Sequence, residues 1–253
     1  MAIDLLLYVC LGLGILLGRL LPHPGDWVGR ATVATIVALV ASLGALLGPV
    51  PWGTLAGAVP VALLFTSTIL LLTVLIEQVW VRSKGPRPGG EGTDGPKGPA
   101  RQLWLPPVLV GALFAGLGAG HLVALPASGL ITGALYLLLF LVGFDLKFHW
   151  ASLRTIGIPT ASAFLGAAAA ASLISLVLGI PGRVALAIAF GFGWYSLAGP
   201  VLAQAVGPAA GLLGFLVNFL RENVPMLSAP ALGRRVRGEG LAAMGGATSM
   251  DTT

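Results

Sequence analysis

Acidic residues inside long apolar segments are the residues of this sequence most able to do chemistry. A carboxylate in the hydrocarbon of a bilayer costs several kcal/mol, so such residues are rare and mark functional sites. Glu222 lies just past the middle of the apolar segment 209–232, and Asn218, four residues earlier, shares its helical face. Arg221 is adjacent but points about 100° away around a helix. The pattern predicts either a structural Arg/Glu network or a carboxylate that faces a polar cavity.

A second acid, Asp251, lies in the segment 245–253 (GGATSMDTT). Small residues and hydroxyls before an acid suit a broken helix whose backbone and hydroxyls bind a ligand, although a polar cytoplasmic tail has the same composition. Glu77 and Asp145 fall near the ends of apolar segments, and we expect Glu77 to be interfacial.

The elements that position these acids must be membrane helices. Hydrophobic residues make up 57% of the 253 residues and charged residues only 9%, whereas soluble domains carry roughly 25% charged residues. We predict an all-α, polytopic transmembrane helix bundle that forms a single domain in the lipid bilayer. At about 20 residues per span, the spans fall near 3–21, 31–49, 56–80, 104–124, 129–146, 156–179 and 209–232.

The positive charges predict the orientation of the chain. With the N-terminus outside, twelve of the fourteen Lys and Arg residues lie on the cytoplasmic side, as the positive-inside rule requires. Five of them flank or lie in segment 82–103, a Pro- and Gly-rich stretch that we expect to be a flexible cytoplasmic loop. Because the basic residues fall between the apolar segments, the net charge of +5 is explained by topology, and nucleic-acid binding is not expected.

The apolar segment 184–206 must enter and leave the membrane on one face for this orientation to hold. Its middle, Gly191–Pro200 (GFGWYSLAGP), contains three glycines and a proline, which favour a re-entrant or broken helix. An ordinary Gly-rich span packed tightly against its neighbours is the alternative.

Weak internal similarity predicts inverted repeats of three spans each. Gly44 and Pro60 match Gly143 and Pro159 at an offset of 99 positions, and the pattern Gly14-x-x-x-Gly18 recurs at 116–120 with an offset of 102. Inverted repeats with broken helices at the midplane are common in secondary transporters.

Three segments resemble the LysO family of bacterial lysine exporters: 191–199 (GFGWYSLAG), 219–222 (FLRE) and 246–251 (GATSMD), with 139–143 (LFLVG) also fitting. The resemblance implies an inner-membrane, multi-pass exporter of L-lysine and its analogue thialysine, in which two intramembrane acids, matching Glu222 and Asp251, are essential. Family members continue past the Met-Asp motif into a further span, so segment 241–253 is expected to begin another broken helix and the natural chain to continue beyond Thr253. Residues expected to line the cavity are Trp194, Tyr195, Ser196, Asn218, Arg221, Thr248 and Ser249.

The resemblance suggests exchange of lysine for protons, because two carboxylates could neutralise the two ammonium groups of lysine and hold protons when the site is empty. A cation/proton antiporter or another small-solute transporter using the same acids is the alternative. An intramembrane aspartyl protease is disfavoured because the Gly-x-Gly-Asp pattern is absent around Asp145. No enzyme activity, cofactor or metal is expected, and a homo-oligomer is compatible with the sequence.

Overall fold

The computed structural model describes residues 5–21, 27–82, 104–123, 125–146, 153–232 and 244, and these form helices joined by short connections, with no strands among them. The helices are α1 (Leu5–Leu20), α2 (Trp27–Leu47), α3 (Trp52–Arg82), α4 (Leu105–Leu122), α5 (Ala127–Asp145), α6 (Leu153–Leu178), α7 (Gly182–Ala189), α8 (Tyr195–Ala205) and α9 (Pro208–Leu232). The prediction of an all-α fold is confirmed.

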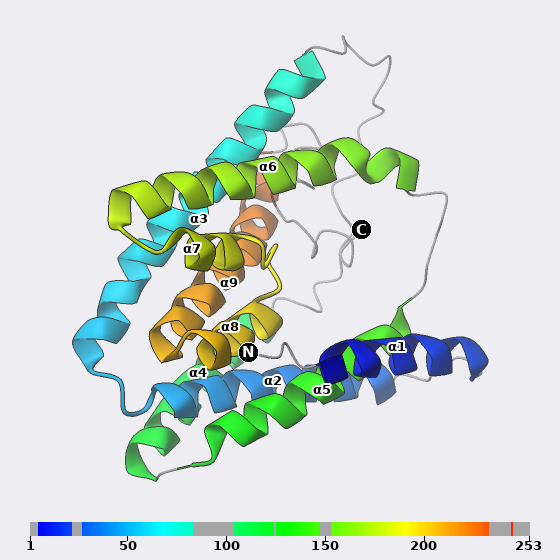
Figure 1. Ribbon diagram of the computed structural model, residues 1–253, viewed down its shortest axis with the longest axis vertical. Coiled ribbons are helices and arrows are strands. Elements are labelled where there is room, and N and C mark those ends of the chain that lie inside the picture. Colours follow the sequence, from blue (N-terminus) through cyan, green and yellow to red (C-terminus); the bar gives the residue numbers. More distant parts are fainter. Residues whose placement is uncertain are drawn as a thin grey trace.

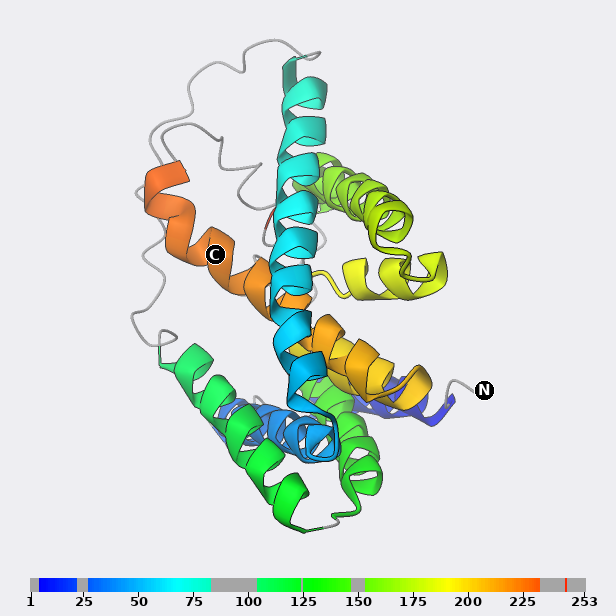
Figure 2. The same ribbon diagram turned by 90° about the vertical axis from the view of Figure 1, so that its left-hand side faces the viewer.

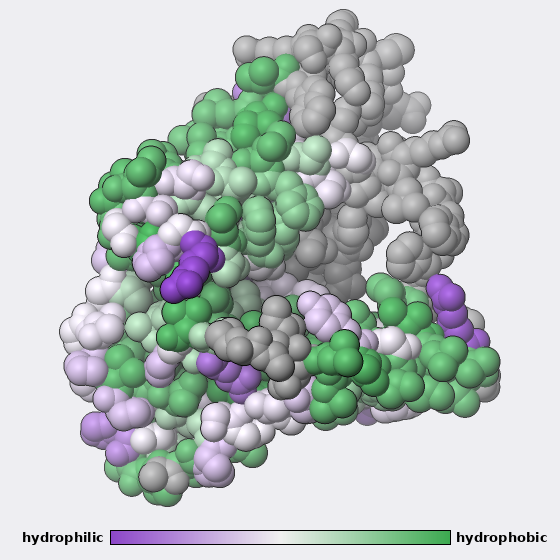
Figure 3. All heavy atoms as spheres, in the orientation of Figure 1, coloured by the Kyte–Doolittle hydropathy of each residue, from purple (hydrophilic) through white to green (hydrophobic). Residues whose placement is uncertain are grey.

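Five of these helices, α2 to α6, are long and apolar enough to cross a membrane. Their exposed surface is rich in large hydrophobic side chains, and Figure 3 shows mostly hydrophobic atoms on the viewed face of the described residues. Helices satisfy their own backbone hydrogen bonds, which is why they are stable in hydrocarbon. The chain is a multi-pass membrane protein.

The predicted spans all coincide with helices. Helix α1 is a shorter apolar helix of 16 residues, and α9, which carries Arg221 and Glu222 at its middle, is not among the five candidates. Helix α3 has 31 residues, about 46 Å at 1.5 Å per residue, so it exceeds the roughly 30 Å of hydrocarbon. The predicted loop 82–103 lies almost wholly outside the described residues.

The first six helices pack in pairs that repeat. Helix α1 packs on α5, α2 packs on α4, and α3 packs on α6. In both of the first two pairs the backbones touch at glycines, where an added Cβ would overlap a carbonyl group of the facing helix. These glycines are Gly14, Gly18 and Gly143 in the α1–α5 pair, and Gly44, Gly116 and Gly120 in the α2–α4 pair.

The two glycine contacts are the same contact in two copies. Gly14 faces the carbonyl oxygen of Phe140, and Gly116 faces that of Ala41. Gly116 follows Gly14 by 102 positions, and Phe140 follows Ala41 by 99, which are the offsets seen in the sequence. The packing therefore relates α1 and α2 to α4 and α5 as structural copies; the extension of the repeat to α3 and α6 and the inverted orientation of the copies stay predictions.

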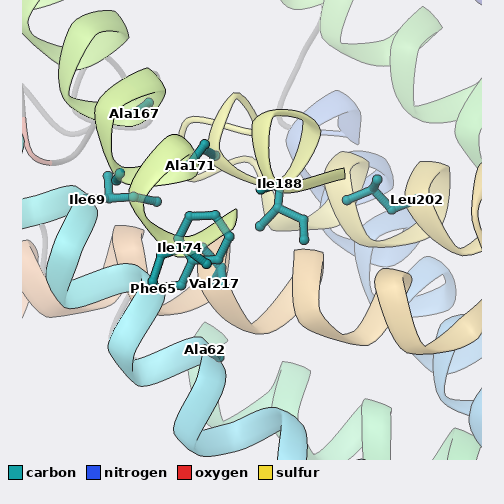
Figure 4. Close-up of a cluster of buried hydrophobic side chains, with 12 residues drawn as sticks. Ala62, Phe65, Ile69, Ala167, Ala171, Ile174, Ile188, Leu202 and Val217 are labelled. Carbon is teal, nitrogen blue, oxygen red and sulfur yellow. The ribbon is translucent and has the colours of Figure 1, made fainter. Parts of the chain in front are cut away.

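Helices α7, α8 and α9 lie between the α3–α6 pair on one side and the α1–α5 and α2–α4 pairs on the other (Figure 1). One hydrophobic cluster joins α3 and α6 to α7, α8 and α9 through residues such as Phe65, Ile174, Ile188, Leu202 and Val217 (Figure 4). A second cluster joins α2 and α4 to α8 and α9. Helix α9 also crosses α3 (Figure 2), where the Thr66 hydroxyl donates a hydrogen bond of 3.1 Å to the Val217 carbonyl.

Candidate functional site: a broken helix held by α9

The segment 184–206 contains two short helices separated by a turn. Helix α7 ends at Ala189, and α8 begins at Tyr195. Between them Phe192 has φ 48° and Gly193 has φ 87°, so two consecutive residues adopt left-handed backbone conformations. Such a conformation costs a residue with a bulky side chain about 1–3 kcal/mol and persists only where the surroundings enforce it. Gly199 and Pro200, expected to help break the helix, instead lie inside α8.

Asn218 of α9 bonds to both sides of this break. Its side-chain oxygen accepts a hydrogen bond of 2.9 Å from the backbone N–H of Gly193. Its Nδ2 donates to the carbonyl oxygens of Ile188, at 3.0 Å, and Gly214, at 2.9 Å. The side chain is fully buried. Asn218 thus satisfies a carbonyl at the end of α7 and an amide in the turn, which water would satisfy in a soluble protein.

Gly191 fits the same contact. An added Cβ at this position would lie 2.5 Å from the Asn218 amide, so the turn and the amide approach as closely as they do because residue 191 has no side chain. The glycine that the sequence suggested as a helix breaker has a steric role toward α9.

Arg221, one turn further along α9, also binds the end of α7. Its Nη1 donates a hydrogen bond of 2.8 Å to the Ala189 carbonyl, and its side chain is 0% exposed. A cation at a helix C-terminus is favoured because the last carbonyls carry partial negative charge. The guanidinium carbon also lies 5.0 Å from the centroid of the Phe192 ring, a cation–π distance.

Two aromatic clusters flank the break. Phe164, Phe190 and Phe192 pack together on the α6 side, with ring centroids 4.5 to 5.7 Å apart. On the other side Tyr195 meets Phe215 and Phe219 edge to face, at 5.7 and 5.5 Å. These rings pack on the two sides of the turn and contribute apolar contacts to it.

Glu222 is partly buried on α9 next to this arrangement. Its charge acts on the phenol of Tyr195 at the start of α8, so the carboxylate and the first turn of α8 are neighbours. Ser196 and Tyr195 are buried and Trp194 is half-buried. The structure therefore brings six of the sequence-predicted residues to one place; Asp251, Thr248 and Ser249 lie outside the described residues.

Glu77 was expected at the membrane interface, and the structure shows that its side chain is buried within the protein; its depth in the membrane stays a prediction. Its side chain is 1% exposed. One turn earlier on α3, Thr73 packs directly against Gly166 of α6, which brings the two helices close enough to bury this face. The hydroxyls of Thr73 and of Ser162 on α6 are also buried, with no hydrogen-bond partner in the described part of the chain. Sequence position near a helix end could not reveal this burial, because it depends on packing between α3 and α6.

Comparisons with known proteins match the C-terminal part of the chain, which contains this broken helix. The family described as "Lysine exporter LysO" matches residues 110–253, more than half of the chain. The lysine exporter LysO of Escherichia coli (strain K12) is 39% identical over 125 residues, which cover 47% of this chain and 42% of that protein. A putative lysine exporter of Haemophilus influenzae is 33% identical over 122 residues, covering 46% of this chain and 62% of the relative. The matches thus span less than two thirds of either curated relative. No solved structure matches.

Proposed function

Because this chain belongs to the lysine exporter LysO family, we propose that it exports L-lysine, and analogues such as thialysine, across the bacterial inner membrane. Both curated relatives carry names that describe lysine export. The proposed orientation has the N-terminus outside, as the distribution of Lys and Arg favours.

The observation that supports this proposal most is the place of Glu222. It lies in a segment matched by the family, beside a broken helix, on a helix that packs against both α3 and α2. Broken helices expose backbone carbonyls and amides that can bind a charged solute where a continuous helix cannot. A carboxylate at that point offers a binding group for a cationic substrate.

Proton antiport is the proposed mechanism. Lysine carries two ammonium groups and one carboxylate at neutral pH, so Glu222 and Asp251 would each neutralise one ammonium group. In the absence of lysine the same carboxylates would take up protons from the outside, because a buried carboxyl group favours the neutral state. Lysine then leaves as protons enter, and one pair of acids serves both.

The test is labelled lysine transport by the protein in proteoliposomes with an imposed pH gradient. Glu222→Gln and Asp251→Asn should each abolish lysine flux while the protein still inserts, because each removes one negative charge and keeps the side-chain shape. Glu91→Gln in the polar segment 82–103 is the matched control and should transport normally. Normal flux in either of the two neutralised variants would overturn the proposal.

The same vesicles separate lysine export from cation/proton antiport. Lysine on the opposite side of the membrane should accelerate the exchange of labelled lysine in counterflow. Arginine, ornithine and sodium are tested in the same way for comparison. Sodium-driven proton movement without any lysine flux would replace the proposal with a cation/proton antiporter.

A further inference from the structure

The guanidinium of Arg221 has one edge in use and one edge unused. Nη1 binds the Ala189 carbonyl at the end of α7, as described above. Nε and Nη2 are buried and have no hydrogen-bond partner within the described ranges. A buried polar group without a partner costs about 1–3 kcal/mol, and a charged group more, so two such nitrogens on one cation call for an explanation.

These two nitrogens define a specific chemical shape. The N–H of Nε and one N–H of Nη2 point in parallel from the same edge of the planar guanidinium, which is the geometry that binds a carboxylate through two hydrogen bonds. The Ala189 hydrogen bond and the Phe192 ring hold the plane in place. The edge is therefore preorganised for an anion with two oxygens, and both of its nitrogens are buried.

Glu222 supplies the opposite charge from the next position along α9. Successive residues of a helix diverge by about 100°, so Arg221 and Glu222 present a cation and an anion in different directions from one turn. A zwitterionic amino acid carries a carboxylate and an ammonium group that need these two partners. From this arrangement we infer that the unused edge of Arg221 binds the α-carboxylate of the transported amino acid while Glu222 binds one of its ammonium groups.

This inference rests on the proposed function and adds a selectivity rule to it. Recognition by two acids alone would accept any diamine of the right length, including cadaverine, which is lysine without its carboxylate. A site built around Arg221 rejects cadaverine and lysinamide, because both leave the guanidinium edge buried without an anion. Charge-assisted hydrogen bonds of this kind correspond to about a 10- to 100-fold difference in apparent affinity.

The experiment is competition against labelled lysine counterflow with the wild-type protein in proteoliposomes. Unlabelled lysine should compete fully, and cadaverine and lysinamide should need at least about 10-fold higher concentrations. Equal competition by cadaverine and lysine would overturn the inference and leave lysine export standing. Absence of any lysine counterflow would overturn the proposed function itself, and this inference with it.

Arg221→Lys tests the residue directly. The introduced ammonium side chain keeps the positive charge and can donate a hydrogen bond to the Ala189 carbonyl, but it lacks the second edge of N–H donors that the guanidinium has. The variant should lose most of its preference for lysine over cadaverine, whereas Arg183→Lys, on the exposed part of α7, should keep it. A lower melting temperature with an unchanged lysine-to-cadaverine ratio would assign Arg221 a purely structural role at the end of α7 and overturn the inference. If Arg221→Lys does not fold, the wild-type competition decides alone.

Discussion

The glycine contacts of the α1–α5 and α2–α4 pairs and the break between α7 and α8 are stabilised by different interactions. At the glycine contacts two backbones touch, and the same geometry occurs in both copies with sequence offsets of 99 and 102. At the break, buried polar side chains of α9 bind free backbone groups. Between apolar helices in lipid, close van der Waals packing at small residues is a principal source of association, whereas buried polar groups are costly unless they are satisfied.

This difference indicates a division of roles. The paired helices form a frame whose stability depends on shape, and the break forms a region whose stability depends on a few hydrogen bonds. Substitutions in the frame should reduce the amount of folded protein. Substitutions at the break should affect stability less, and those at Glu222 should affect transport alone.

The largest expected effect is at the frame. Gly116→Leu places a side chain where the carbonyl of Ala41 lies, and backbone cannot move away as a flexible side chain can. Overpacking costs about 1–3 kcal/mol in ordinary cores, and we expect about 3 kcal/mol or more here. Size-exclusion profiles in detergent should show little folded protein. The control is Gly118→Leu on the same helix, where nothing lies within 4 Å of an added Cβ, and equal loss in both variants would contradict the account.

An intermediate effect is expected at the centre of the break. Asn218→Ala removes three hydrogen bonds and leaves the Gly193 amide and the Ile188 carbonyl buried without their partner. At about 1–3 kcal/mol for each such group, the melting temperature should fall clearly. Asn223→Ala, whose side chain bonds only to the Phe219 carbonyl of its own helix, should lower it much less. Equal melting temperatures for the two variants would show that Asn218 does not hold the break.

A smaller effect on stability is expected at Gly191. Gly191→Ala puts a methyl group 2.5 Å from the Asn218 amide, which must shift to accommodate it. We expect a loss of about 1–2 kcal/mol. The comparison variant is Gly182→Ala at the start of α7, where the nearest atom is the Ser175 hydroxyl at 3.6 Å. Thermal unfolding of both variants checks this, and a Gly191→Ala protein as stable as the wild type would exclude the close contact.

The frame was predicted well from the sequence because its signals are local. Apolar segments of the right length gave helices, and the offsets of Gly14 and Gly44 reappear as equivalent contacts in space. The break was also predicted, although only part of the expected segment is broken. Pro200 lies in the middle of α8, where its missing N–H removes one backbone hydrogen bond but does not end the helix.

The partners within the site could not be predicted because they come from distant parts of the chain. The bonds of Asn218 to Ile188 and of Arg221 to Ala189 join positions about thirty residues apart. Similarly, the burial of Glu77 depends on the approach of α6 at Gly166, more than eighty residues later in the sequence. A one-dimensional pattern contains the residue types of such contacts but not their pairing.

The most direct test of the central claim is to measure lysine flux and melting temperature on the same preparation of Glu222→Gln. We predict that flux is lost while the melting temperature changes by only a few degrees, because the amide keeps the shape of the side chain and removes the charge that lysine and protons need. Lysine flux at the wild-type rate in this variant would contradict the claim that Glu222 is the binding carboxylate of the site.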